Sequence, residues 1–85
     1  GVPGTAVALK GGKPVAVLKR QGKVLETYTE DGIEDVINEL ARDFKNKSLF
    51  PEKRRLTIKE YPKELGALLG NAGFLREMQD YTLYR

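Results

Sequence analysis

Residues 31–47, DGIEDVINELARDFKNK, are the stretch on which the fold depends. Asp31 is a candidate N-cap, and Glu34 three positions later completes the pattern of a capping box. A lone helix of this length is marginally stable in water, so its apolar side must pack against strands formed by the flanking segments. The apolar residues recur with the period of a helix and form one stripe: Ile33, Val36, Ile37, Leu40, Ala41 and Phe44.

Three short extended segments precede this helix. Residues 5–9 and 14–20 flank a glycine pair at 11–12, which is typical of a two-residue hairpin. A second tight turn at 21–22 separates residues 14–20 from residues 23–29, so the three segments predict an antiparallel meander. Alternation in the second segment predicts two faces, one with Val15 and Val17 and the other with Ala16 and Leu18.

The chain after the helix begins with a connector at residues 48–53. Leu49 and Phe50 are too apolar for a free loop, so we expect them to plug the end of the core. Residues 54–61 then alternate between apolar and polar side chains, which predicts a half-buried strand.

A second helix is predicted to begin at Pro62, which suits a first helical turn, and to end before Gly73, the expected left-handed residue. Residues 74–78 and 81–85 then form a last extended pair, turned at 79–80. The apolar stripe of this helix consists of Leu65, Leu68, Leu69 and Ala72.

These elements predict an α+β fold, an antiparallel β-meander with two helices in the order βββ-α-β-α-β(β). Eighty-five residues are enough for one domain, so we expect residues 1–85 to fold as a single unit. The chain starts Gly-Val-Pro without a methionine, and we interpret it as the excised C-terminal domain of a longer protein.

The composition argues against catalysis by this domain alone. The chain has no cysteine and no histidine, so it lacks thiolate ligands, the commonest general base and the commonest metal ligand. Neither a GxGxxG nor a GxxxxGK[ST] phosphate-binding motif is present. We therefore expect no enzyme activity and no cofactor. Because the chain has no cysteine, nothing indicates an oxidising compartment, and we expect a cytoplasmic location. No apolar run approaches the length of a membrane span, so we expect no membrane partner.

Charge is the strongest functional signal, because the net charge is only +3 but the basic and acidic residues lie in separate blocks of the sequence. Residues 1–23 carry five bases and no acid, residues 24–44 are strongly acidic, and residues 45–63 carry seven bases against two acids. Basic turns of a meander can lie along a phosphate backbone, although the same residues can also be ordinary solvated surface. The predicted nucleic-acid-binding residues are Lys10, Lys13, Lys19, Arg20, Lys23, Lys53, Arg54 and Arg55.

Two further groups of residues have both a functional and a structural interpretation. Asp35, Glu39 and Asp43 stack on one helix face, where they form either a cation site or, as we favour, an exposed acidic surface. The four tyrosines could stack on unpaired bases, but we favour a place at the rim of the core with wet hydroxyls. They are Tyr28, Tyr61, Tyr81 and Tyr84.

The turn and core pattern resembles the C-terminal module of large helicase-related (Lhr-type) DEAD/DEAH-box helicases. The resemblance rests on KPVAVL at 13–18 after a glycine turn, a second glycine turn at Gly22, LTI at 56–58, LGNAGF at 69–74 and YTL at 81–83. It implies an accessory domain of a superfamily 2 ATP-dependent helicase, whose partners are the rest of that enzyme and DNA or RNA. ATP binding and hydrolysis would belong to the parent protein, because the motor motifs are absent from these residues.

One position departs from the family pattern. The family often shows Gly-Gly-Arg at the second hairpin, where this chain has Gln21-Gly22-Lys23, so a bidentate guanidinium contact is not carried over. The resemblance assigns no individual binding residue, and the eight bases above rest on charge alone. The alternative hypothesis is a structural or protein-interaction module that uses a smooth strip at Gly66 and Gly70 together with the acidic helix face.

Overall fold

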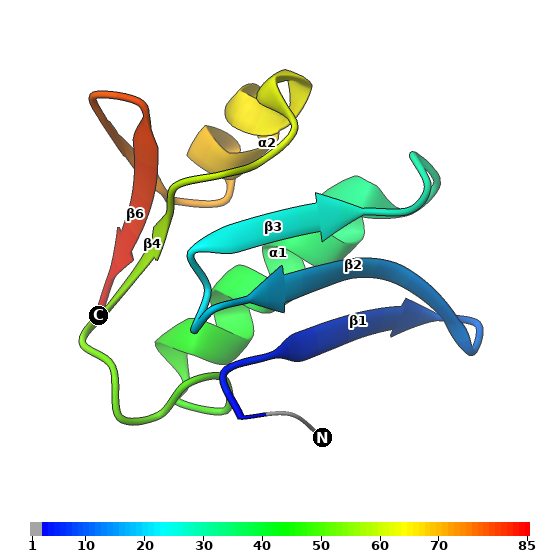
Figure 1. The fold of residues 1–85 in the computed structure, drawn as a ribbon, viewed down its shortest axis with the longest axis horizontal. Coiled ribbons are helices and arrows are strands. Elements are labelled where there is room, and N and C mark those ends of the chain that lie inside the picture. The colour runs from blue at the N-terminus through cyan, green and yellow to red at the C-terminus, as the bar shows by residue number, and fades with distance from the viewer. Residues whose placement is uncertain (1–2) are drawn as a thin grey trace.

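The computed structural model describes residues 3–85, which form two antiparallel sheets of three strands each, with helices packed against them (Figure 1). The first sheet has the order β1-β2-β3 and the second has the order β4-β6-β5. The predicted α+β class and element order are confirmed. The elements are β1 (Ala6–Lys10), β2 (Lys13–Lys19), β3 (Val24–Thr27), α1 (Ile33–Lys45), β4 (Arg55–Ile58), the 3-10 helix η1 (Lys63–Leu65), α2 (Gly66–Asn71), β5 (Leu75–Glu77) and β6 (Asp80–Tyr84).

The first sheet contains an irregularity that the alternation pattern did not predict. Ala8 of β1 pairs with Ala16, but the next residue, Leu9, pairs with Pro14, so Val15 is an extra residue in β2. Val15 and Ala16 therefore both join the core, whereas Val17 is buried on the opposite side of the sheet outside that cluster. The expectation that Val15 and Val17 share one face is wrong for this reason.

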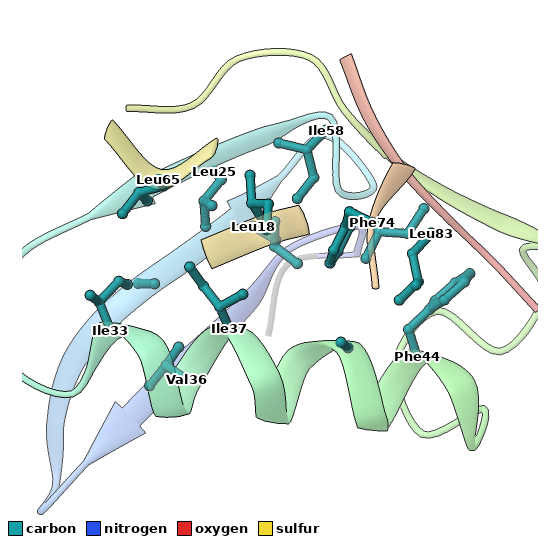
Figure 2. Packing of buried hydrophobic residues seen from close by; sticks show 14 of the residues in the cluster. Leu18, Leu25, Ile33, Val36, Ile37, Phe44, Ile58, Leu65, Phe74 and Leu83 are labelled. Atoms are coloured by element: carbon teal, nitrogen blue, oxygen red, sulfur yellow. The ribbon is translucent and has the colours of Figure 1, made fainter. Parts of the chain in front are cut away.

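Helix α1 lies across the first sheet and turns its apolar stripe toward both sheets. Figure 2 shows Ile33 and Ile37 pointing toward Leu18 and Leu25, while Phe44 lies near Leu83. The predicted stripe is confirmed, since every member is buried except Leu40, which is half-buried and packs against the core.

The predicted capping box at the start of α1 is wrong. Gly32 occupies the N-cap position in a left-handed conformation (φ 74°), and no side chain caps the helix. Asp31 instead donates its backbone N–H to the Thr29 hydroxyl at 3.2 Å. Only a residue that tolerates positive φ fits at this position, so the helix starts one residue later than the sequence pattern suggested.

The two sheets are joined through β3 and the residues that follow β4. The backbone N–H groups of Lys59 and Glu60 both donate to the carbonyl of Lys23, at 2.8 and 3.0 Å. Leu25 in turn donates to the carbonyl of Glu60 at 2.8 Å. These long-range bonds place the turn between β2 and β3 next to β4.

The last part of the chain follows the predicted plan with a shift at the hairpin. Glu77 pairs with Asp80, so the turn between β5 and β6 is formed by Met78 and Gln79, one residue earlier than expected. Gly73 has φ 109° and ends the helical segment as predicted. Phe50 is 9% exposed and closes the core as expected.

None of the helices between residues 3 and 85 is long and apolar enough to cross a membrane.

Candidate nucleic-acid interface

The turn between β2 and β3 is seated tightly against the second sheet. Arg20, Gln21 and Gly22 all have positive φ, with values of 54°, 58° and 92°. A side chain at Gly22 would overlap the Leu56 side chain of β4, so only glycine allows this close approach. The basic residues of the turn are therefore held beside the basic residues that open β4.

A depression of about 350 Å³ lies where this turn meets the outer face of the second sheet. Its bases come from three separate segments of the chain, the turn, the connector and β4 with the residues after it. Four bases face two acids, so the depression is net positive. The lining residues are Gln21, Lys23, Lys53, Arg55, Thr57, Lys59, Glu77 and Asp80.

The two acids of this depression are already engaged. Lys59 forms an ion pair with Asp80 at 2.9 Å. The Tyr84 hydroxyl donates to the Glu77 carboxylate at 2.6 Å, and this bond, together with one from Thr82, lowers the pKa of Glu77 below its ordinary value. Among residues 3–85, Lys23, Lys53 and Arg55 form no ion pair, although the charge of Arg55 contributes to the lowered pKa of Glu77. The charges of Lys23 and Lys53 are therefore available to an external anion.

Two further depressions continue this surface around the end of the second sheet, with volumes of about 670 and 420 Å³. Both are lined by Lys53 and Arg54 together with Glu52 and Arg85. The second of them reaches Lys45 and Lys47 at the end of α1. We call the continuous surface the basic face, and define it by the six bases that it gathers: Lys23, Lys45, Lys47, Lys53, Arg54 and Arg55.

Arg85 borders the basic face but has a structural role. Its guanidinium donates to the carbonyls of Phe44 and Pro51 at 2.7 and 2.6 Å, and to that of Phe50 at 3.0 Å. The same group lies 4.2 Å from the centre of the Phe44 ring. Arg85 therefore ties β6 to the end of α1 and the connector, and few of its donors are left for a ligand.

Four of the eight predicted binding residues thus come together on the basic face: Lys23, Lys53, Arg54 and Arg55. Arg20 belongs to the same turn as Lys23 but lines none of the three depressions, and Lys19 is paired with Glu26 at 2.8 Å. The hydrogen bond to Glu26 raises the pKa of Lys19 and keeps its charge directed to an internal partner.

Lys10 and Lys13 are not part of this surface. They flank the turn between β1 and β2, which lies at the other end of the first sheet (Figure 1). Lys10 pairs with Asp35 of α1 at 3.2 Å, and its side chain lies against Gly32. The acidic face of α1 thus offsets the basic charge at that end.

The predicted binding residues did not include Lys45 and Lys47, which the structure places on the basic face. A usable signal was present, because both belong to the same basic block at 45–63 as the residues at 53–55. The sequence did not show how the connector folds, and this fold brings Lys45 and Lys47 to the same surface as residues 53–55.

The other candidate chemistry finds little support in the structure. No group of three histidine, cysteine or acidic residues within the described part of the chain is placed to hold a metal ion. Tyr61 and Tyr81 pack edge to face with 5.4 Å between ring centres, as expected for tyrosines at the core rim. Tyr28 and Tyr84 remain exposed, by 59% and 41%.

Comparison of the chain with protein-family models, curated proteins and solved structures finds no match.

Proposed function

We propose that this chain is the C-terminal accessory domain of an Lhr-type superfamily 2 ATP-dependent helicase, and that it contacts DNA or RNA backbone without sequence specificity. The proposal includes a cytoplasmic location, the rest of the helicase as partner, and ATP hydrolysis confined to that parent enzyme. It draws on the resemblance in turn and core residues described above. The domain itself acts as a binding surface and not as a catalyst.

The observation that carries the proposal is the convergence of bases from separate segments on the basic face. Lys23 reaches this surface from the turn between β2 and β3, and Arg55 reaches it from β4. Clustered bases that outnumber the neighbouring acids attract a polyanion and release its counterions when they neutralise phosphates. Such contacts position a nucleic acid but do not read its bases, which accounts for the absence of proposed sequence specificity.

The test is fluorescence anisotropy of the 85-residue chain with labelled single-stranded and double-stranded oligonucleotides over a salt series. We expect affinity to fall steeply as salt rises, with a slope that corresponds to roughly three to five phosphate contacts. Absence of binding at low salt would contradict the proposal. Binding that does not depend on salt would also contradict it, because phosphate contacts release counterions.

A second function, docking to another protein, is favoured by a different observation. Val7 and Leu9 of β1, an edge strand of the first sheet, are 55% and 58% exposed. The glycine strip offers less support, because a Cβ at Gly66 would lie 2.8 Å from the Tyr81 hydroxyl of the same chain. Val7→Lys with Leu9→Lys would break association with the parent helicase if docking used this edge, and would leave nucleic-acid affinity unchanged or slightly higher.

A further inference from the structure

Tyr84 stands on the outer face of the second sheet and lines one of the three depressions of the basic face. It is the cross-strand partner of Arg55, and it lines the depression of about 670 Å³ together with Lys53 and Arg54. With 41% of the residue exposed, part of its ring is open to a ligand. An aromatic ring is thus surrounded by three bases that form no ion pair within residues 3–85.

The Tyr84 ring is also fixed in position. Its hydroxyl donates to Glu77, which lies beside Asp80 at the hairpin end of the sheet. Thr82 lies between Tyr84 and Asp80 on this face of β6 and is only 1% exposed. The ring must therefore incline over Thr82, with one side against the sheet and the other toward solvent. The same hydrogen bond raises the pKa of Tyr84 above its ordinary value, so the hydroxyl stays protonated and continues to donate.

A fixed ring beside unpaired cations suits a ligand that offers both an aromatic plane and a phosphate. The bases of a duplex are already stacked on one another, whereas those of a single strand have free faces. The ionised Glu77 repels phosphate, which favours a strand that places its phosphates toward Lys53 and Arg54 in the depression that Tyr84 lines and Glu77 does not.

We propose that Tyr84 is a stacking platform for an unpaired nucleobase, and that the basic face binds single-stranded in preference to double-stranded nucleic acid. This inference rests on the proposed function, because it needs the basic face to hold the strand. It adds a ligand class and a residue that charge alone does not indicate.

The test compares oligothymidine of about ten nucleotides, a length typical of such sites, with an abasic strand of equal length. Both strands carry the same phosphates, and only the first carries bases. We expect the native chain to bind oligothymidine roughly tenfold more tightly than the abasic strand, the effect of about one stacked base. This comparison uses the unaltered chain and does not depend on how a variant folds.

Variants then assign the effect to one ring. Tyr84→Leu should reduce the affinity for oligothymidine to that for the abasic strand, while the abasic strand binds as before. Tyr84→Phe keeps the ring and should retain most of the preference. Tyr28→Leu is the matched control, because Tyr28 is the more exposed tyrosine but lies at the other end of the first sheet. It should change neither affinity.

The two proposals fail in different ways. Equal affinity of the native chain for both strands, or a preference that survives Tyr84→Leu, would overturn the stacking role and leave phosphate binding in place. Failure of the native chain to bind either strand at low salt would overturn the proposed function itself.

Discussion

The two turns of the first sheet carry similar charge in the sequence but differ in the structure. The turn between β1 and β2 has open space around Gly11 and Gly12, and its Lys10 is paired with Asp35. The turn between β2 and β3 is packed against β4, and its Lys23 lies among other bases and forms no ion pair with any residue from 3 to 85. The distribution of basic residues along the sequence therefore does not by itself predict where unpaired positive charge lies on the surface, because the fold determines which basic residues form ion pairs.

The largest expected effect comes from the glycines of these two turns. Gly22→Ala should destabilise the fold by about 3 kcal/mol, since the new methyl group overlaps Leu56 and φ is 92°. Gly11→Ala, with φ 58° and no neighbouring atom, should cost only about 1 kcal/mol. Urea denaturation of both variants checks the difference. Equal losses would show that the second turn is not held against β4 as described.

The second-largest expected effect concerns nucleic-acid binding by the basic residues at the two ends of the first sheet. Combined substitution of Lys53, Arg54 and Arg55 by glutamine should lower affinity for nucleic acid at least about tenfold at low salt, and reduce the salt slope by about three. The matched control, Lys10→Gln with Lys13→Gln, should leave both nearly unchanged, because these residues lie at the other end of the first sheet from the basic face and Lys10 is paired with Asp35. Anisotropy titrations measure both quantities. A larger loss of affinity in the control variant would show that the turn between β1 and β2, and not the basic face, binds the nucleic acid.

A smaller difference in stability is expected between alanine substitutions at the two helical glycines, because only one of them has room for a methyl group. Gly70→Ala meets no atom within 4 Å and should stabilise α2 by roughly 0.5–1 kcal/mol. Gly66→Ala brings a methyl group to 2.8 Å from the Tyr81 hydroxyl, so the gain in helix propensity should be cancelled or reversed. Thermal denaturation distinguishes the two. Equal stabilisation by both variants would show that Tyr81 does not confine Gly66.

The smallest effect is a shift in the titration of Tyr84, the exposed tyrosine of the basic face. The bond between Tyr84 and Glu77 raises the pKa of Tyr84 and lowers that of Glu77. Its stabilising effect is therefore lost as pH falls through the lowered pKa of Glu77, and again as pH rises through the raised pKa of Tyr84. In Glu77→Gln, one tyrosine should ionise at lower pH than in the native chain, as measured by ultraviolet absorbance. Superimposable titration curves would contradict the bond.

Much of this fold follows from local sequence patterns. The stripe of α1, the glycine turns and the left-handed Gly73 are consequences of periodicity and backbone preference, which the sequence displays directly. The helix start was misplaced because Gly32 at positive φ took the N-cap position from Asp31. The extra residue at Val15 was missed because alternation alone does not reveal a bulge.

The candidate site was predictable in composition but not in arrangement. Its residues stood out as basic blocks, yet whether Lys23 would lie near Arg55 depended on bonds between residues far apart in sequence, such as Lys59 to Lys23. No local pattern encodes that pairing, or the pairing of Lys10 with Asp35 that removes the opposite end from the site. Tyr84 was one of four tyrosines considered for base stacking from the sequence, and its position beside Arg55 on the adjacent strand is what distinguishes it from the other three.

The most direct test of the central claim is an NMR titration of the isotope-labelled chain with short oligothymidine at low salt. The account predicts backbone amide shift changes at Lys23, Arg54, Arg55 and the neighbouring part of β6, and none around Gly11 and Gly12. Shift changes concentrated at the turn between β1 and β2, or spread evenly over both turns, would contradict the claim that the fold gathers binding charge at one end only.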